Sequence, residues 1–378
     1  MFDELDLRPG DIAGIEDLRR LPLMDKAVYQ GLTIQERGAD DVPTGLCRTF
    51  QTSGTTGHPI RFLMTQRDFT FRNMNSARAY LASGYKPWQR MAVLAGDRMV
   101  NEKRSWNERL GLWRRREISS WKSPGQWLDD LTAWKPHFLI GRVTTLVLLA
   151  EAARASGHPL RGLRSVFASA EVLDDASRSL LKSEFGCPVL DFYLSFEGGC
   201  LAWECPACSG YHISADMVIM EVLRGDGTPA AAGEEGEVVI TNLHSTAMPL
   251  IRYRQGDTVV LSTKQPRCGR RLPLLDRIYG RKEDMLTLPS GRRIAPQAVP
   301  HVFIPVPGIK RWQVVQTALD RLEISIEPRE GFDDSARRLL REEMMKLLRE
   351  DVRIDIIEVP EISRDPSAKS RPIISLVR

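Results

Sequence analysis

The sequence predicts an α/β protein with a large N-terminal domain, whose mixed and parallel sheets are covered by helices and joined by a β-rich subdomain, and a small α+β C-terminal domain. Three observations favour this class. Strand-like and helix-like segments alternate from residue 91 to residue 193, shorter strand-like runs separated by turns follow from about Met217, and the 378 residues exceed one ordinary domain. We place the N-terminal domain at residues 1–280 and the C-terminal domain at residues 281–378.

The first elements surround a short segment rich in glycine and hydroxyl groups. Residues 1–45 are expected to form an irregular and helical lead-in, and residues 47–50 a short strand. A helix is expected at about residues 65–84. The apolar run Met91–Ala95 is typical of a buried strand.

The next region alternates between the two kinds of element. Strands are expected at Phe138–Gly141, Ser165–Ala168 and Pro188–Tyr193, and helices at Thr144–Ala155 and Asp174–Phe185. This order favours a parallel sheet with both faces covered. Functional residues of such sheets lie in loops beyond the carboxyl ends of strands, which is where Ser169-Ala170-Glu171 and Ser195-Phe196-Glu197 stand.

After the alternating region, the strand-like segments become shorter and are separated by turns rather than by helices. Strand-like runs at Val218–Leu223, Gly236–Thr241 and Thr258–Leu261 favour antiparallel pairing, and the turn Gly280–Asp284 leads into the last domain. A helix at about residues 334–350 presents one apolar face. That face consists of Leu340, Met344, Leu347 and Leu348.

Composition narrows the class of protein and its partners. Hydrophobic residues make up 42% and charged residues 27%, which is typical of a globular protein. The 53 basic and 49 acidic residues leave a net charge of +4, and they do not form the concentrated basic face of a nucleic-acid binder. No apolar run approaches the roughly 18 residues that cross a bilayer. The acidic start Met1–Asp6 lacks an export signal. We therefore expect a cytoplasmic protein with neither nucleic acid nor membrane as partner.

Two local features each leave alternatives open. The densest basic cluster, Arg114–Arg116, is interpreted as the solvated edge of a helix, and its functional alternative is a landing site for a phosphorylated co-substrate. Three of the six cysteines crowd between Cys200 and Cys208, which indicates metal rather than a disulfide framework; free loop thiols are the alternative.

The segment Thr52–Gly57 can wrap a polyphosphate. Its glycines let backbone N–H groups converge on an anion, and its hydroxyls add donors without bulk. It differs from a Walker A loop because no lysine follows it. A flexible surface loop is the alternative for such a segment taken alone.

Four segments, taken in order, resemble motifs of the adenylate-forming superfamily, and within it of the phenylacetate-CoA ligase-like branch. They are Thr52–Gly57, Tyr193–Glu197, Arg252–Asp257 with Gly280–Asp284, and Ala368–Arg371. The resemblance spans nearly the whole chain. It implies ATP-dependent activation of a carboxylic acid, of which aromatic acids are the branch's best-known examples, to an acyl-adenylate with pyrophosphate release. Transfer of the acyl group to coenzyme A would follow.

The resemblance also implies roles for individual residues in binding ATP. The phosphate loop would consist of Thr52, Ser53, Gly54, Thr55, Thr56 and Gly57. Tyr193 would stack on adenine beside the turn Ser169, Ala170 and Glu171. The ribose hydroxyls would bind to Asp257, with Arg281 as a further donor.

Two catalytic roles follow from the same resemblance. Glu197 would hold Mg²⁺, a hard cation suited to carboxylate and phosphate oxygens. Lys369 would reach the substrate carboxylate and the α-phosphate from a mobile C-terminal domain that pivots near Glu283.

This chain departs from the family pattern at Phe196, which stands where a hydroxyl normally contacts the α-phosphate. Phenylalanine cannot donate that hydrogen bond, and Ser195 is the candidate to replace it. Relatives usually have further helical residues before the segment that matches Leu21-Pro22, and their absence here bears on the lid over the acid pocket or on a dimer surface. A homodimer stays open.

A structural zinc site is a further hypothesis. Cys205 and Cys208 have the spacing of a ligand pair, and His212 lies close behind. Relatives of the branch carry another cysteine near the position of Cys268, so we expect these four residues as ligands, with Cys200 in reserve.

Two other functions remain open beside the acid-CoA ligase. The adenylate could pass to an amine or to a carrier-protein thiol. Alternatively, the chain could be a nucleotide-binding protein that has lost catalysis, as Phe196 suggests; the presence of Lys369 argues against it, because a pure binder has no need of that lysine.

Overall fold

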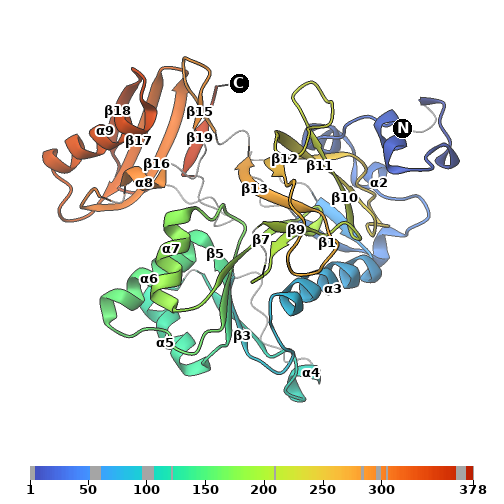
Figure 1. Cartoon of the computed structure of the whole chain (residues 1–378), viewed down its shortest axis with the longest axis horizontal. Coiled ribbons are helices and arrows are strands. Elements are labelled where there is room, and N and C mark those ends of the chain that lie inside the picture. Colours follow the sequence, from blue (N-terminus) through green and yellow to red (C-terminus); the bar gives the residue numbers. More distant parts are fainter. Residues whose placement is uncertain are drawn as a thin grey trace. The chain divides into compact units, whose positions relative to one another are not determined.

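The computed structural model describes nine stretches of the chain and divides it into two compact units. The described residues are 5–51, 61–95, 106–120, 122–207, 210–281, 285–294, 299–303, 305–362 and 372–377. The first unit comprises Met1–Glu171 and Leu180–Ile278, and the second Val172–Ser179 and Tyr279–Arg378. Figure 1 shows their helices and strands in the colours of the sequence.

A single mixed sheet of 11 strands dominates the first unit, in the order β10-β11-β12-β13-β9-β8-β7-β6-β5-β3-β4. The strands are β3 Met91–Ala95, β4 Arg115–Ser119, β5 Phe138–Arg142, β6 Ser165–Ser169, β7 Val189–Ser195, β8 Gly199–Glu204, β9 Tyr211–Ile213, β10 Val218–Leu223, β11 Glu235–Asn242, β12 Tyr253–Leu261 and β13 Leu274–Arg281. Neighbours from β4 to β7 are parallel, whereas β7 to β9 and β10 to β12 pair antiparallel. The α/β class is confirmed, and the β-rich region continues the same sheet.

Helices cover both faces of the parallel half, because alternate residues of each strand point to opposite sides. Helix α3, Gln66–Ala82, lies on one face, and α5, Pro124–Trp134, with α6, Val143–Ser156, lies on the other (Figure 1). The α3 side contains an aromatic cluster in which Tyr80 stacks on Phe167 with ring centroids 5.5 Å apart. This packing fixes α3 against the sheet.

Local sequence explains where α3 and α5 begin. Thr65 and Asp68 form a capping box at the start of α3, and Ser123 and Gln126 form one at the start of α5, so orphan N–H groups of each first turn are satisfied. Helix α5 also has proline at its first position, which pre-sets the helical backbone angle.

The interpretation of Arg114–Arg116 as a helix edge is wrong. Arg115 and Arg116 begin β4, which pairs with β3 and, among the strands of the described residues, forms one edge of the sheet. Both side chains are exposed, whereas Ile118 is buried. Charged side chains on an edge strand oppose pairing with another chain, which accounts for arginines in a strand.

Smaller elements precede and accompany the large sheet. They are η2 Pro9–Asp11, η3 Ile15–Arg20, α1 Lys26–Gly31, α2 Ile34–Arg37, η4 Thr44–Leu46, β1 Arg48–Gln51, β2 Arg61–Met64, α4 Trp106–Arg109 and α7 Asp175–Phe185. Strands β1 and β2 pair antiparallel. The lead-in is thus irregular and helical, as predicted.

The second unit has an α+β core of its own. A sheet in the order β18-β17-β16-β19 packs with α8 and α9, and β14 pairs with β15. These elements are β14 Leu286–Thr287, β15 Arg293–Ile294, α8 Pro300–Phe303, β16 Ile309–Ala318, β17 Arg321–Pro328, α9 Asp334–Leu348, β18 Arg353–Glu358 and β19 Ile373–Ser375. The predicted apolar face of α9 is confirmed, because Leu340, Met344 and Leu348 are fully buried and Leu347 packs beside them.

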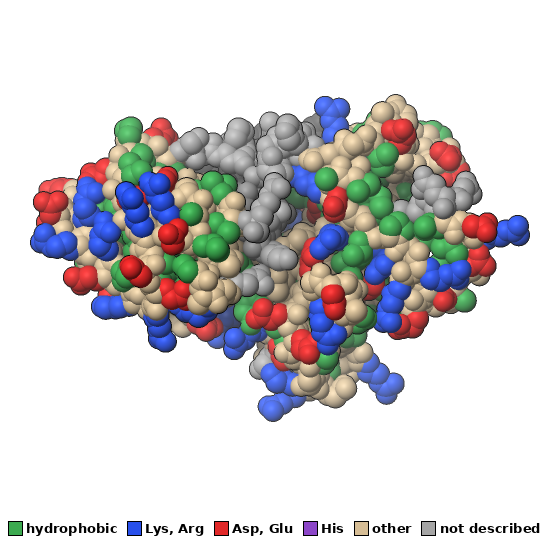
Figure 2. Space-filling model, turned by 90° about the horizontal axis from the view of Figure 1, so that it is seen from above, with side chains coloured by type: hydrophobic (Ala, Val, Ile, Leu, Met, Phe, Trp, Pro, Cys, Tyr) green, Lys and Arg blue, Asp and Glu red, His purple; other side chains and the backbone are tan. Residues whose placement is uncertain are grey.

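Surface charge and helix length relate to two predictions, that neither nucleic acid nor a membrane is a partner. On the face shown in Figure 2, basic and acidic side chains are interspersed with hydrophobic ones rather than gathered by sign. None of the helices within the described stretches combines the length and hydropathy needed to cross a membrane.

Candidate active site

The carboxyl ends of neighbouring parallel strands bring predicted site residues to one edge of the sheet. Strand β5 ends at Arg142, which lies opposite Ser169 at the end of β6, and Ser169 lies opposite Phe192 of β7. The segments that follow β6 and β7 therefore emerge at the same edge, where ligands of open α/β sheets bind.

The turn after β6 has an unusual backbone. Ala170 has φ +65°, a left-handed conformation that costs a non-glycine residue about 1–2 kcal/mol. The carboxylate of Glu171 accepts hydrogen bonds from the backbone N–H of Thr144 at 2.8 Å and from its hydroxyl at 3.1 Å, near the start of α6. Glu171 thus satisfies an orphan donor of that helix and holds the turn against it.

Two predicted nucleotide-binding residues touch each other. The phenol of Tyr193 on β7 donates a hydrogen bond to Oδ2 of Asp257 on β12, with an oxygen–oxygen distance of 2.5 Å. The residues are 64 positions apart in sequence. This contact places an aromatic ring beside a carboxylate, the two groups that adenine stacking and ribose binding require.

A tight turn between β7 and β8 carries Glu197. Ser195 lies opposite Gly199 in the antiparallel pair, so Phe196, Glu197 and Gly198 form the turn. The backbone N–H of Gly198 donates to Oγ of Ser195 at 2.8 Å. Gly199 has φ +75°, which favours glycine.

Two side chains from other elements hold this turn. The guanidinium of Arg72 on α3 donates to the carbonyl oxygens of Ser195 at 2.8 Å and of Phe196 at 2.7 Å. The amide of Asn242 on β11 donates to the carbonyl oxygen of Glu197 at 3.1 Å.

Glu197 lines a pocket of the first unit that has both polar and apolar walls. The pocket is lined by Met64, Asp68, Arg72, Glu197, Gly198, Met217, Asn242, His244 and Ser245. A half-buried carboxylate in such a setting is a suitable ligand for Mg²⁺, whose preferred donors are oxygens.

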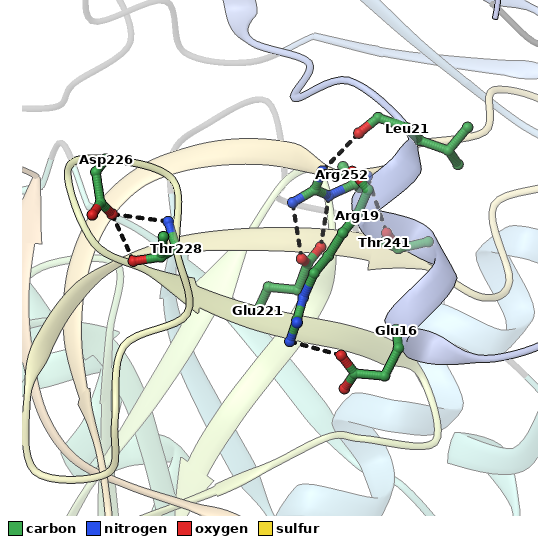
Figure 3. Close-up of polar contacts among 8 residues, drawn as sticks. All are labelled: Glu16, Arg19, Leu21, Glu221, Asp226, Thr228, Thr241 and Arg252. Atoms are coloured by element: carbon green, nitrogen blue, oxygen red, sulfur yellow. Dashed lines mark hydrogen bonds and ion pairs between the residues drawn. The ribbon is translucent and has the colours of Figure 1, made fainter.

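Arg252 fixes the segment that leads to Asp257, as Figure 3 shows. Its guanidinium forms a two-point ion pair with Glu221 at 3.0 and 3.1 Å and donates to the carbonyl oxygen of Leu21 at 2.6 Å. Thr241 Oγ1 accepts from its backbone N–H at 3.0 Å. We call these contacts of Arg252 with Glu221, Leu21 and Thr241 the Arg252 fork. Arg252 is only 5% exposed, and the fork links the lead-in to the central sheet.

Three of the predicted zinc ligands converge. The Sγ atoms of Cys205 and Cys268 each lie 3.3 Å from Nε2 of His212, and the three atoms lie within 4.8 Å of one another. Ligand atoms around tetrahedral zinc are separated by about 3.5 Å, given Zn–S near 2.3 Å and Zn–N near 2.0 Å, so this donor set fits the ion. Burial, with Arg270 nearby, lowers the pKa of His212 to about 4, which leaves the imidazole in the neutral form that binds metal. Cys200 is fully buried elsewhere and is not part of this cluster.

Other predicted residues are not placed with these groups. Thr52, Ser53, Gly54, Thr55, Thr56, Gly57, Cys208 and Lys369 lie outside the described residues. Arg281 ends β13, in the second unit. Sequence reasoning missed Arg72, Asn242 and the set of contacts made by the Arg252 guanidinium.

Comparison with known proteins gives relatives along most of the chain. Residues 286–376 match the model of the CapK C-terminal domain. The phenylacetate-coenzyme A ligase of Thermus thermophilus is 27% identical over 358 residues, which cover 88% of this chain and 77% of the relative. The phenylacetate-coenzyme A ligase of Escherichia coli is 29% identical over 297 residues, which cover 76% and 67%.

A solved structure shares the fold. The 2-hydroxyisobutyryl-CoA ligase in the postadenylation state, in complex with R3-HIB-AMP, superposes with a TM-score of 0.77 at 22% identity, covering 99% of this chain and 84% of that one. At this identity the superposition shows a shared fold. Sequence similarity to the phenylacetate-coenzyme A ligases along most of the chain supports the phenylacetate-CoA ligase-like branch of the adenylate-forming superfamily and an AMP-forming acid–coenzyme A ligase.

Proposed function

We propose that this ligase activates an aromatic carboxylic acid with ATP and passes the acyl group to coenzyme A. The observation that supports nucleotide binding at this site is the contact between Tyr193 and Asp257, on the same sheet edge as the turn after β6. The aromatic class is suggested by the names of the two phenylacetate-coenzyme A ligases. We place the reaction in the cytoplasm, where thiols such as Cys205 and Cys268 stay reduced.

Charge is the main obstacle to the first half-reaction. The acid and the triphosphate are both anionic, so the site must supply donors where negative charge develops. In our proposal Thr52–Gly57 holds the β- and γ-phosphates, Tyr193 stacks on adenine, and Asp257 accepts the ribose hydroxyls with Arg281 as a further donor. The turn Ser169–Glu171 lies beside the adenine.

The substrate carboxylate attacks the α-phosphorus, and the bond from that phosphorus to the bridging oxygen of pyrophosphate breaks. Lys369 neutralises charge on the carboxylate and the α-phosphate in this step. Glu197 would hold Mg²⁺, which would supply charge compensation for the phosphates. Residues 281–378 then rotate away near Glu283, which removes Lys369 and admits the thiol of coenzyme A.

Zinc in this proposal is structural. Cys205, His212 and Cys268, with Cys208 as the fourth ligand, would leave no open coordination position. Metal analysis of protein purified without chelators should return about one equivalent of zinc, and Cys268→Ser should lower both zinc content and melting temperature. Less than a small fraction of an equivalent would contradict the site.

The substrate proposal is tested by acid-dependent release of pyrophosphate from ATP. Phenylacetate, benzoate and 2-hydroxyisobutyrate are compared with and without coenzyme A, and the product is identified by mass. An aromatic acid should give the highest kcat/KM and an acyl-CoA product. Preference for 2-hydroxyisobutyrate would overturn the aromatic class, and adenylate that reacts only with an amine or a carrier-protein thiol would overturn the acceptor.

A nucleotide-binding protein without catalysis is the second candidate, and Phe196 is the observation that favours it. No hydroxyl stands at that position to contact the α-phosphate. Normal ATP binding by wild type, with no pyrophosphate release for any acid and release restored in Phe196→Thr, would favour this candidate. Acid-dependent release by wild type would exclude it.

A further inference from the structure

Three consecutive backbone carbonyls of the β7–β8 turn accept hydrogen bonds from side chains of other elements. Arg72 holds those of Ser195 and Phe196, and Asn242 holds that of Glu197, at 2.8, 2.7 and 3.1 Å. Successive carbonyls of an extended strand point in opposite directions, so one guanidinium can reach two of them only where the backbone turns. Arg72 therefore selects one conformation of this turn.

Arginine is suited to this role because its donors are fixed in a planar fork. A lysine offers a single charged nitrogen and cannot span two carbonyl oxygens in the same geometry. The methylene Cγ of Arg72 also lies 3.3 Å from where a Cβ on Gly199 would stand, so the side chain packs along the turn as well as donating to it.

The helix that carries Arg72 is itself anchored to the same hairpin. Asn75, one turn along α3, donates to the carbonyl oxygen of Cys200 on β8 at 2.8 Å and accepts from Ser214 at 3.2 Å. Arg78 donates to the side-chain oxygen of Asn75 at 2.8 Å. Arg72 thus acts from a rigid element, which is what precise positioning requires.

Within the described contacts, the side chains of the turn itself donate to none of these three carbonyls. Oγ of Ser195 accepts from the N–H of Gly198, and Phe196 offers no polar atom in its side chain. A turn held only by Ser195 would leave the following carbonyls without partners in a partly buried region. Arg72 and Asn242 provide those partners from outside the motif.

We propose that Arg72, assisted by Asn242, is a positioning residue that sets the Glu197 carboxylate for binding of Mg²⁺ and ATP. Arg72 and Glu197 line the same pocket, so a change in the turn moves the carboxylate relative to that pocket. This inference rests on the proposed function, because it takes Glu197 as the Mg²⁺ ligand.

The test compares Arg72→Lys with Arg67→Lys, a matched change on the same helix. Arg67 is exposed, its guanidinium lies 5.6 Å from the ring of Phe71, and it does not reach the turn. Two quantities are measured: the Mg²⁺ concentration that gives half-maximal ATP binding by calorimetry, and kcat and KM for acid-dependent pyrophosphate release.

Arg72→Lys should raise the half-maximal Mg²⁺ concentration about tenfold and lower kcat about 100-fold, the effect of displacing a reacting group by about 1 Å. KM for the acid should stay near that of wild type, and Arg67→Lys should match wild type throughout. A lower melting temperature with unchanged Mg²⁺ dependence and kcat would show a purely structural role and overturn the inference.

Two further outcomes separate this inference from the function. If Arg72→Lys does not fold, Asn242→Ala removes the donor to the Glu197 carbonyl and should shift the Mg²⁺ dependence in the same direction; no shift would overturn the inference. Mg²⁺-dependent ATP binding by a wild type that releases no pyrophosphate would refute the proposed function, while the binding measurements still decide the role of Arg72. If the affinity of wild type for ATP does not change with the Mg²⁺ concentration, the inference is overturned.

Discussion

The phenol of Tyr193 and the carboxylate of Asp257 share a 2.5 Å hydrogen bond between β7 and β12, strands that are not neighbours in the sheet. The bond fixes the ring relative to the acceptor oxygens. Because Asp257 has two carboxylate oxygens, it can hold Tyr193 and still accept from a ligand hydroxyl.

The first prediction concerns this pair. Asp257→Asn removes charge and one acceptor, so affinity for ATP should fall about 10- to 100-fold, the equivalent of one hydrogen bond to a charged group. Tyr193→Phe keeps the ring and loses only the bond, so affinity should fall by tenfold or less. Calorimetric titration with ATP measures both, and a larger effect for Tyr193→Phe than for Asp257→Asn would contradict the assigned roles.

The second prediction concerns the turn after β7. A Cβ on Gly198 would overlap Cδ2 of Leu201 and lie 3.0 Å from Cδ1 of Ile240. Gly198→Ala should therefore lower the free energy of unfolding by about 1–3 kcal/mol through overpacking. Gly225→Ala is the control, since a Cβ there meets nothing within 4 Å. Equal stability of the two variants in urea would refute the crowding.

The third prediction concerns the fork in Figure 3. The side chains of Arg252 and Glu221 are 7% and 12% exposed, so loss of one partner leaves a buried charge unpaired. Arg252→Met should lower the free energy of unfolding by roughly 3–5 kcal/mol. The double variant with Glu221→Leu should recover part of that loss, and a double-mutant cycle in denaturant measures the coupling. Strict additivity would argue that the pair does not interact.

The fourth prediction is a pH dependence. Burial would raise the pKa of Asp68, but hydrogen bonds from the Thr246 hydroxyl and from the backbone of Thr65, Ala247 and Thr246 lower it below its ordinary 3.8. A folded-state pKa below the unfolded one stabilises the protein above about pH 4, and this contribution is lost as pH falls through and below 3.8.

The variant Asp68→Asn lacks that titration. It should be less stable than wild type at pH 7, and the stability difference between the two proteins should shrink as pH drops below 4. Urea unfolding at pH 3, 4, 5 and 7 measures the difference. A constant difference across this range would show that the Asp68 carboxylate is not responsible.

Patterns of hydrophobicity predicted the regular elements well. Met91–Ala95 and Val218–Leu223 were placed residue for residue, because buried strands are continuous or alternating apolar runs. β4 was missed, since its arginines belong to an edge strand whose identity depends on β3 as its partner. Pairing between distant segments is not encoded in local sequence.

The same limit applies to the site. The residues of the motifs could be named from the sequence. In the structure Tyr193 contacts Asp257, and Cys205 and Cys268 lie beside His212. Arg72 carried no signal, because a charged residue on a helix is ordinarily solvated. The role of Arg72 depends on where α3 packs against the sheet. The aromatic cluster sets that position, and the residues next to Arg72 in sequence do not.

The most direct test of the central claim is acid-dependent exchange of labelled pyrophosphate into ATP, measured for wild type and Lys369→Ala. The account predicts exchange by wild type that requires an acid, at least a 100-fold loss in Lys369→Ala, and equal ATP binding by both proteins. Exchange by Lys369→Ala at the wild-type rate, or no exchange by wild type with any acid despite ATP binding, would contradict it.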